Sequence, residues 1–411
     1  MQFIYNIFIT LLAFGLRLLS WFNEKAKKGV QGRKKSLAIV KEKLANQKVI
    51  WMHAASLGEY EQGLPVLEQI RQQFPSHKVL VTFFSPSGYE NVVKKQHIAD
   101  AVCYLPFDKK QDIKAFVSVF QTEIFFTVKY DFWYHLLRGL KEQGAKIYVV
   151  SALFYEKQAF FKPYGKWLVQ QLKQNVDWFF HQTKHSEELA KKIGLINSSV
   201  SGDTRFDRVK QIQHRDNTVP FIKKFKGDSP LVVFGSSWEA EEGIADRVAS
   251  QYPNAKIIIA PHDIKRNIGL KHYRNPLLKY SELNEKSNDL SLASNILVID
   301  SIGLLSKIYA YADIAVVGGG FHTAGLHNIL EAATFGKPVV FGNHYKKNPE
   351  ADGLIHFGGA QSFSTEGEAA DFVLKLLNDA GLREKMAIKA KQFVQMQPNA
   401  TEVVVKKILE R

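Results

Sequence analysis

Two series of short apolar runs, separated by stretches with helical periodicity, constrain the fold of this chain most strongly. The first series covers residues 49–53, 79–84, 101–105, 124–128, 147–150 and 178–181, with a weaker run around Val200. The second covers residues 231–234, 256–260, 296–299, 314–317 and 339–341. Apolar runs of this length are typical of strands buried on both faces. Their alternation with helices indicates βαβ units on parallel sheets.

The length of the chain predicts two domains, because 411 residues exceed one ordinary hydrophobic core. We expect an α/β fold of two Rossmann-like parallel-sheet domains facing across a cleft, at residues 23–210 and 211–411. Residues 1–22 form a separate N-terminal segment, and the polar stretch 211–218 before Pro220 is the expected linker. Neither half has a G-x-G-x-x-G motif after its first strand and the chain has no P-loop, which disfavours NAD and Walker-type binding.

Charge and composition narrow the possible partners. The net charge of +15 predicts attraction to an anionic partner. The single cysteine, Cys103, rules out an intramolecular disulfide and a thiolate-rich metal site, and the histidines lack HExxH-type spacing. We therefore expect no metal and no cofactor. A non-enzymatic module that binds nucleic acid is disfavoured, because the chain lacks an aromatic-basic RNA motif and a recognisable DNA-reading motif.

The N-terminal segment, residues 1–22, is apolar and carries Arg17 as its only formal side-chain charge. A basic run follows it, with lysines or arginines at positions 25, 27, 28, 33, 34 and 35. The segment is close to the length that spans a bilayer, and it also suits an amphipathic anchor in the membrane interface. We predict membrane association in one of these two forms, with a merely packed helix as the alternative. The basic flank favours the cytoplasmic face.

The stretch WMHAASLGEYEQG, residues 51–63, predicts a strand, a tight turn and a helix. In a parallel sheet this turn lies at the carboxyl edge, where ligands bind. It presents Ser56 and Glu59 there, and a carboxylate in this place can accept a proton from a hydroxyl nucleophile. The alternative is that Glu59 is only a first-turn carboxylate favoured by the helix dipole.

In the second half, residues 312–342 form the sharpest group of candidates. Three glycines, at positions 318–320, follow a strand and allow a ligand to approach the backbone. Asn328 can cap a helix whose N–H groups would hold a phosphate, and Glu331 can accept hydrogen bonds from ribose hydroxyls. An ordinary capped helix with a first-turn glutamate is the alternative.

Other strand ends of the second half offer further ligand groups. His262 and Arg266 follow Pro261 as possible donors to a phosphate or carboxylate. The backbone of Ile302, Gly303 and Leu304 lies at a strand-to-helix turn, where main-chain groups can read a base edge. Together these segments favour nucleotide binding.

At this point the sequence resembles the 3-deoxy-D-manno-octulosonic acid (Kdo) transferases, which are the glycosyltransferases of family 30 and have the GT-B fold. The motifs that carry the resemblance are HAASLGE, SPSGYE, GDTRFD, FGSSWEAEE, PHDIKR and GLHNILEAATFGKPVVFG. They occur in the order and spacing of that family, and the resemblance covers nearly the whole chain.

The resemblance implies metal-independent transfer of Kdo from CMP-Kdo to an acidic, phosphorylated lipid A precursor of the lipid IVA type, with inversion. This step of lipopolysaccharide core biosynthesis takes place at the cytoplasmic face of the inner membrane. The resemblance also implies roles for individual residues. Glu59 matches the general base, Asp131 a second acid, and Arg205 a group that stabilises the transition state. The donor-contacting positions are Ser236, Pro261, His262, Arg266, Ile302, Gly303, Leu304, Gly320, Asn328, Ile329, Leu330 and Glu331. The competing hypothesis is another GT-B enzyme that uses a UDP-sugar, either a transferase or an epimerase.

The chain departs from the family pattern at several positions. In VKYDFWYHLL, Lys129 replaces the first of two acids and Tyr134 replaces a proline, whereas Asp131 keeps the second acid. Arg205 stands where the family usually has a lysine, and arginine keeps the charge but changes its shape. His262 replaces a common arginine, and Leu304 replaces an acid. We expect these changes to affect acceptor handling rather than the fold.

Overall fold

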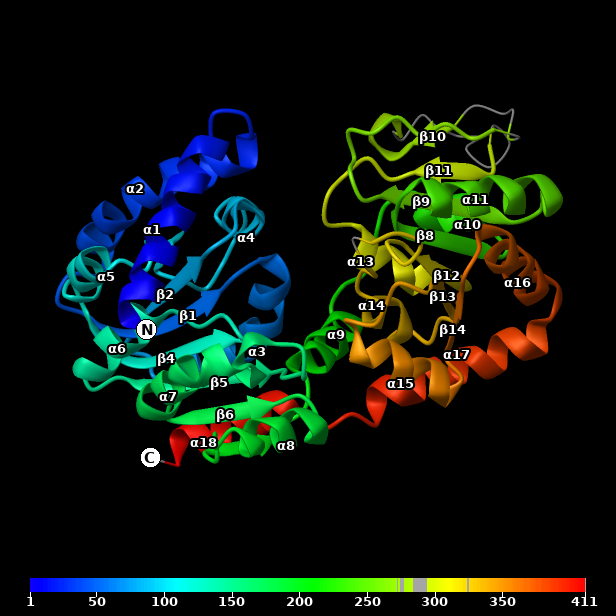
Figure 1. The fold of residues 1–411 in the computed structure, drawn as a ribbon. Coiled ribbons are helices and arrows are strands. Elements are labelled where there is room, and N and C mark those ends of the chain that lie inside the picture. Colours follow the sequence, from blue (N-terminus) through cyan, green and yellow to red (C-terminus); the bar gives the residue numbers. More distant parts are fainter. Residues whose placement is uncertain (272, 274–276, 284–293, 324, 411) are drawn as a thin grey trace. The chain divides into compact units, whose positions relative to one another are not determined.

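The structure is a computed structural model of the chain, and it describes residues 1–271, 273, 277–283, 294–323 and 325–410. These residues form two compact units (Figure 1). The first unit contains Met1–Arg208 together with Pro398–Arg411, and the second contains Val209–Gln397. Each unit has its own parallel sheet, which confirms the predicted α/β class.

The sheet of the first unit has seven parallel strands in the order β3-β2-β1-β4-β5-β6-β7. They are β1 (Lys48–Ala54), β2 (Lys78–Phe83), β3 (Ala101–Tyr104), β4 (Gln121–Val128), β5 (Lys146–Ala152), β6 (Trp178–His181) and β7 (Ser198–Val200). Its helices are α1 (Gln2–Leu19), α2 (Glu24–Leu44), α3 (Leu57–Gln73), α4 (Pro86–Val92), α5 (Lys110–Val117), α6 (Tyr134–Glu142), α7 (Lys166–Asn175), α8 (Lys184–Lys192), the start of α9 (Thr204–His214), and α18 (Ala400–Leu409). All seven predicted strands of this half are therefore confirmed.

Alternation along β1 explains how this sheet is buried on both faces. Val49 and Trp51 pack into a core with residues of α2, α5, α6 and α7, whereas Ile50 and Met52 pack into a second core with α3. Each face is covered by helices, so every strand residue after Lys48 is buried. Consecutive strand residues point to opposite faces, which is why the run reads as continuously apolar.

The C-terminal helix α18 belongs to the first unit, whereas the sequence analysis placed residues up to 411 in the second domain. Its Val404, Val405 and Ile408 complete the core around Ile50 and Met52. Asp207 Oδ2 accepts hydrogen bonds from the backbone N–H and the hydroxyl of Thr401, both at 2.7 Å. The apolar stripe of the last helix has no local signal for which sheet it covers, so chain order alone gave the wrong unit.

The sheet of the second unit also has seven parallel strands, in the order β10-β11-β9-β8-β12-β13-β14. They are β8 (Leu231–Ser237), β9 (Lys256–Pro261), β10 (Leu278–Lys279), β11 (Ile296–Val298), β12 (Ile314–Val317), β13 (Val339–Gly342) and β14 (Ala360–Phe363). Its helices are α10 (Ile222–Lys226), α11 (Glu239–Gln251), α13 (Leu305–Ile308), α14 (Leu330–Ala333), α15 (Pro349–Phe357), α16 (Glu366–Asn378) and α17 (Ala380–Gln395). The five predicted strands are present, and β10 and β14 are additional. The predicted linker at 211–218 begins inside α9, which runs to His214.

Helix α1 lies on the surface of the first unit. It buries Ile9 and Ala13, and Tyr5 donates a 2.6 Å hydrogen bond to Asp108 Oδ2. Several of its other apolar side chains are exposed, including Phe3 (75%) and Leu11 (63%), and so is Phe22 (86%) just after the helix. The helix is long and apolar enough to cross a membrane by length and composition alone.

Candidate active site

The carboxyl end of β1 holds the predicted base. The chain turns from β1 into α3 at Ser56, which occupies the N-cap position, and Glu59 lies in the first turn of α3. The Ser56 hydroxyl donates a hydrogen bond to Glu59 Oε2. The Glu59 side chain is half-buried at the carboxyl edge of the sheet. This hydrogen bond orients one oxygen of the Glu59 carboxylate.

Asp131 follows β4, the strand beside β1, and is held by two donors. Its Oδ2 lies 2.6 Å from His53 Nε2 and accepts a 3.1 Å hydrogen bond from Trp133 Nε1. His53 is fully buried at the end of β1, and its Nδ1 lies 2.9 Å from Thr82 Oγ1. Trp51 Nε1 donates to the same Thr82 oxygen, so the Thr82 hydroxyl can donate to His53 Nδ1. The same Nδ1 also lies 3.2 Å from the Thr82 carbonyl oxygen, and because a carboxylate only accepts, His53 Nε2 is the donor to Asp131.

A second set of charges follows β7. The buried Asp203 carboxylate accepts hydrogen bonds from Arg205 Nε at 2.9 Å and from Gln62 Nε2 at 2.6 Å. Burial alone would raise the pKa of Asp203, but the Arg205 guanidinium and the Lys129 ammonium together bring it below its ordinary value. Lys129 adopts a left-handed backbone conformation with φ of 63°. Lys129, which stands where the resemblance leads us to expect an acidic residue, thus places a positive charge near Asp203.

Tyr130 lies near both Glu59 and Asp131. It is 42% exposed, and its pKa is raised by burial and by the neighbouring Tyr155, Glu59 and Asp131. Glu59 and Asp131 thus both lie near enough to Tyr130, at this edge of the sheet, to affect its pKa. Sequence reasoning missed His53, Asp203 and Gln62 as partners. His53 lies inside the motif HAASLGE and Asp203 inside GDTRFD, so membership of these motifs was the signal that could have found them.

The matching edge of the second unit is built from glycine backbone. A Cβ atom at Gly318 would lie 2.1 Å from the Ser236 carbonyl oxygen, so only glycine fits between β12 and β8. A Cβ atom at Gly320 would lie 2.6 Å from the backbone N and O of Gly342. The N–H of Gly319 donates a 3.1 Å hydrogen bond to Glu241 Oε1. Ser236 and Gly320 thus lie where backbone groups can meet a ligand.

A cluster of aromatic side chains lies beside these glycines. The indole of Trp238 stacks on His262 with ring centres 4.7 Å apart, and it meets His322 edge to face at 4.6 Å. The His262 ring also lies 4.7 Å from the His327 ring, centre to centre, and the backbone N–H of His262 donates to the Ser237 carbonyl at 3.0 Å. Burial, with the nearby His262 and His322, lowers the pKa of His327 to about 4. Trp238, His322 and His327 were not among the predicted residues.

Arg266, predicted as a donor to a ligand, already pairs with Glu242 on α11 and lies 3.9 Å from Glu239. Burial raises the pKa of Glu242, an effect that the Arg266 charge opposes. Pro261 and Arg266 also line a cavity of about 240 Å³ with Lys265, Lys279 and Asp300. This cavity lies at the carboxyl ends of β9 and β11.

The Asn328 segment differs from the prediction. Helix α14 is only four residues long, and Ile329 rather than Asn328 occupies its N-cap position. Asn328 Oδ1 still accepts a hydrogen bond from Leu330 N, and its Nδ2 donates to Glu331 Oε1, both at 3.1 Å. A single turn offers a much weaker dipole than the predicted helix, because few peptide units align.

The remaining predicted donor residues lie in the turn before α13. Ile302 is 67% exposed, Gly303 has φ of 92°, and Leu304 directly precedes the helix. Among residues 294–323, no hydrogen bond or ring contact joins this turn to the glycines at positions 318–320.

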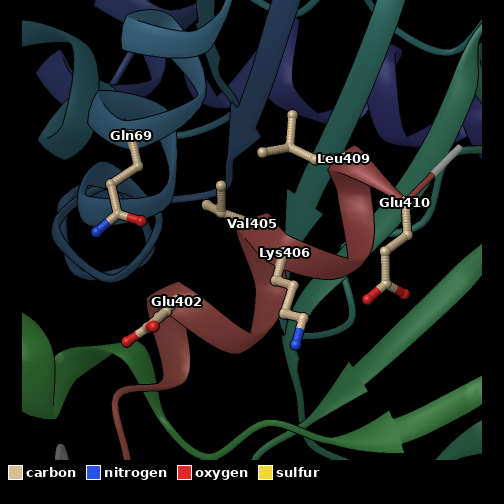
Figure 2. Close-up of a pocket in the computed structure, with 6 residues that line it drawn as sticks. All are labelled: Gln69, Glu402, Val405, Lys406, Leu409 and Glu410. Atoms are coloured by element: carbon tan, nitrogen blue, oxygen red, sulfur yellow. The ribbon is translucent and has the colours of Figure 1, made fainter.

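Other features of the described chain lie apart from these edges. A groove of about 430 Å³ lies between α3 and α18 (Figure 2). Its lining residues are Gln69, Glu402, Val405, Lys406, Leu409 and Glu410, none of which was predicted to act in catalysis or donor binding. Within the residues that the structure describes, no cluster of three or more His, Cys, Asp or Glu side chains is placed to hold a metal ion.

Comparison with solved structures defines the class of protein. The UDP-GlcNAc 2-epimerase of Neisseria meningitidis bound to UDP-GlcNAc aligns with a TM-score of 0.59 at 17% identity, over 89% of this chain and 100% of that one. Acinetobacter baumannii MurG aligns with a TM-score of 0.52 at 15% identity, over 89% and 100%. At such identities the similarity establishes the fold, which is GT-B. With the sequence relatives below, it defines a glycosyltransferase of GT-B architecture.

Sequence comparison gives the family. Residues 31–208 match the family model described as 3-deoxy-D-manno-octulosonic-acid transferase (kdotransferase). A 3-deoxy-D-manno-octulosonic acid transferase of Aquifex aeolicus is 27% identical over 85% of this chain and 92% of its own length. A bifunctional glycosyltransferase/methyltransferase of Fusobacterium nucleatum is 28% identical over 73% of this chain, which spans only 48% of that relative. The chain is therefore a glycosyltransferase that is similar to the Kdo transferases over most of its length, as its motifs predicted.

Proposed function

We propose that this chain transfers Kdo from CMP-Kdo to a lipid A precursor of the lipid IVA type, a step in lipopolysaccharide core biosynthesis. The proposal is supported by the match of the first unit to the Kdo transferase family and by the Aquifex aeolicus transferase, which the chain matches over 92% of its length.

The observation that carries the proposal is the placement of Glu59 at the carboxyl edge of the first sheet, oriented by Ser56. In the proposed step the acceptor oxygen bonds to the anomeric carbon of Kdo, and its proton passes to the Glu59 carboxylate. The electron pair of the breaking bond between that carbon and the phosphate oxygen leaves with CMP. Attack opposite the leaving group inverts the anomeric configuration.

The neighbouring charges would support this step without a metal ion. We assign Asp131 the role of a fixed negative group, because His53 and Trp133 hold its Oδ2 in place. Arg205 would stabilise negative charge that develops in the transition state. Asp203 orients the Arg205 guanidinium through Nε, and Lys129 adds a second positive charge near the same carboxylate.

The second unit would bind the CMP part of the donor. Gly318–Gly320 bring backbone within reach of a ligand, and the imidazoles beside Trp238 supply flat surfaces and N–H donors. Pro261 and His262 lie next to this backbone, and Ile302–Leu304 and Asn328–Glu331 would complete the donor site from the turns before α13 and α14.

Product analysis by mass spectrometry tests the base. With CMP-Kdo generated in situ and a tetra-acylated precursor, the wild type should add at least one Kdo unit. The Glu59→Gln variant should lose at least about 100-fold in rate, the usual contribution of a general base. Glu61→Gln is the matched control, because Glu61 lies two residues away and pairs instead with Arg208 at 2.9 Å. Full activity of Glu59→Gln would remove Glu59 from this role.

Nucleotide binding separates this proposal from the competing one. CMP should raise the melting temperature of the wild type and of Glu59→Gln equally, since ligand binding to the folded state stabilises it. UDP should have little effect. Stabilisation by UDP but not by CMP would instead indicate a UDP-sugar enzyme of the same fold.

We also propose that α1 binds the cytoplasmic face of the inner membrane and lies in its plane. Tyr5 and Asn6 on one side of the helix hydrogen-bond to Asp108 and His135 of the first unit, at 2.6 and 2.7 Å. The opposite side exposes Phe8 and Leu11, 57% and 63%. A helix docked along the unit by polar contacts, with its apolar side outward, suits an interfacial anchor. Spanning would break these contacts.

Spin labels can measure this orientation. Cys103 is fully buried, so cysteines introduced at Phe3, Leu11 and Leu18 can be labelled selectively. On vesicles that contain anionic lipid, an in-plane helix predicts the same shallow depth at all three positions. A label at Leu11 that lies far deeper than the other two would show a spanning helix instead.

A further inference from the structure

A small cavity of about 240 Å³ lies in the first unit, lined by residues of α1, α2 and α5 and by Pro106 and Phe107, which follow β3. Its charged lining residues are Arg17, Arg33, Lys34 and Asp112. Three cationic side chains therefore face one carboxylate. The cavity adjoins α1, the helix that carries the exposed apolar side chains. It lies beside β3, the outermost strand of the sheet.

Arg33 is the fixed group in this cavity. Its Nη1 donates to the Gly29 carbonyl at 3.0 Å and its Nη2 to the Phe84 carbonyl at 2.6 Å. The guanidinium carbon lies 4.6 Å from the centre of the Phe84 ring and 4.8 Å from that of Phe107. Helix α2 can approach this closely because an added Cβ at Gly32 would lie only 2.2 Å from the Tyr104 ring.

The Arg33 charge is not balanced within the described protein. No ion pair joins Arg33 to a carboxylate in the parts of the chain that the structure describes, and its buried Nε has no hydrogen-bond partner there. Burial lowers the pKa of Arg33 to about 10. A guanidinium that is largely removed from water and lacks a counter-ion is costly, and a bound anion would offset that cost.

Arg33 is also connected to the proposed catalytic groups. Phe84, on which its guanidinium lies, stacks on Trp133 with ring centres 5.2 Å apart, and Trp133 donates to Asp131. Two side chains therefore separate Arg33 from Asp131. A ligand held at Arg33 by one group could place another group near the carboxyl edge, provided that the ligand is as large as a glycolipid.

We propose that this cavity binds a phosphate ester group of a lipid, with Arg33 as the main contact and Arg17 and Lys34 at the rim. Guanidinium groups suit phosphate because their N–H donors match its oxygens in pairs. The assignment to the acceptor, whose phosphate would be held while its hydroxyl meets Glu59, rests on the proposed function. A phospholipid of the bilayer carries the same chemical group and is the other source.

The acceptor arm of the test measures KM and kcat in detergent, with the phosphorylated precursor and with the same precursor lacking its phosphates. For Arg33→Gln the KM of the phosphorylated acceptor should rise about 10- to 100-fold, the effect of losing a hydrogen bond to a charged group. Arg17→Gln should raise it about threefold, because that side chain is exposed. The KM of the acceptor without phosphates should not change.

Arg17→Gln keeps the test decisive if Arg33→Gln fails to fold, since Arg17 lies on the surface of α1. Arg138→Gln is the control, because it removes an exposed positive charge of the same unit that pairs only locally, with Glu142 and Tyr134. The vesicle arm compares flotation of these variants with phosphatidylglycerol and with phosphatidylcholine vesicles.

A phosphate-dependent loss in the acceptor arm assigns the cavity to the acceptor. A loss of flotation on phosphatidylglycerol alone, with KM unchanged, assigns it to a bilayer phospholipid. If neither arm differs between Arg17→Gln or Arg33→Gln and the control, the cavity does not bind phosphate and the inference is overturned. Absence of Kdo product from the wild type with either acceptor would instead reject the proposed function.

Discussion

The two sheets of this chain share one design but carry different groups at their carboxyl edges. Both have seven parallel strands, and in both the first strand in the sequence lies in the interior of the sheet. In the first unit that edge holds charged side chains, Glu59, Asp131, Asp203 and Arg205, each hydrogen-bonded to a neighbour. In the second unit it holds Gly318–Gly320 and a stack of aromatic rings.

The difference lies in what fixes each edge. Side-chain hydrogen bonds hold the first edge, so a single substitution there can change one charge and leave the backbone in place. The second edge depends on backbone packed against backbone, as Gly318 is against Ser236. Fixed charges suit proton transfer and charge stabilisation. Main chain that carries no side chains suits the binding of a ligand that must approach closely. One fold thus supports two tasks through the residues at its strand ends.

The largest effect should come from adding one methyl group to the second edge. In Gly318→Ala the new Cβ would meet the Ser236 carbonyl at 2.1 Å, and backbone cannot move aside as a flexible side chain can. We expect a loss of about 3 kcal/mol in the unfolding free energy of the second unit, at the upper end for overpacking. CMP binding should weaken by more than about 100-fold, measured by titration calorimetry beside urea unfolding.

Gly58→Ala gives the matched change at the first edge. Its Cβ would lie 3.8 Å from the nearest atom, Ser56 Oγ, which is ordinary contact. Gly58 is in the first turn of α3, so alanine should leave stability unchanged or raise it by up to about 1 kcal/mol. Equal damage from the two substitutions would show that the edges do not differ in this respect.

The strands were predictable because each is a short apolar run buried on both faces, a local property of the sequence. Glu59 was predictable for a similar reason, since strand, turn and helix follow each other within HAASLGE. The two missed strands show the limit of this signal. β10 is two residues long, and β14 reads AQSF, which is only partly buried.

Partners that are distant in the sequence were not predictable. Nothing local to His53 indicates that its Nε2 meets Asp131, 78 positions later. Arg266 was predicted as a ligand donor, and only the packing of α11 against the following loop gives it Glu242 as a partner. Likewise, α18 covers the first sheet because Val404 and Ile408 fit its core. These pairings depend on tertiary packing that a single sequence does not encode in any short window.

A smaller effect should follow Asp203→Asn, which tests whether the charges of the first edge act together. The change removes the carboxylate that holds the Arg205 guanidinium, which is 18% exposed. We expect a loss of about 2 kcal/mol in the stability of the first unit, less than for a fully buried pair, and about tenfold slower transfer. CMP affinity should stay within about twofold, because the second edge is untouched. A parallel loss of CMP affinity would contradict the division of tasks.

The smallest effect concerns pH and a histidine in the core of the first unit. His181 at the end of β6 is fully buried, and its Nε2 has no hydrogen-bond partner among the described residues. Burial lowers its pKa to about 4. Between pH 6.5 and 4 the unfolded chain binds a proton at this site that the folded unit does not, so stability falls as the pH falls.

The size of this loss at pH 5.5, relative to pH 7.5, should be about 1 kcal/mol. Urea unfolding of the wild type and of His181→Phe at both pH values measures it, because the variant should lose this part of the pH dependence while keeping the ring packing with Phe154 and Phe179. Saturating CMP should leave this difference between the wild type and the variant unchanged, since His181 belongs to the first unit. The pKa of His327 is also lowered to about 4, but this residue lies at the second edge. Bound anionic CMP should favour its protonated form, so CMP affinity should increase as the pH falls. If CMP abolished the effect of His181 on stability, and if the affinity for CMP did not depend on pH, the effects expected of the two histidines would be contradicted.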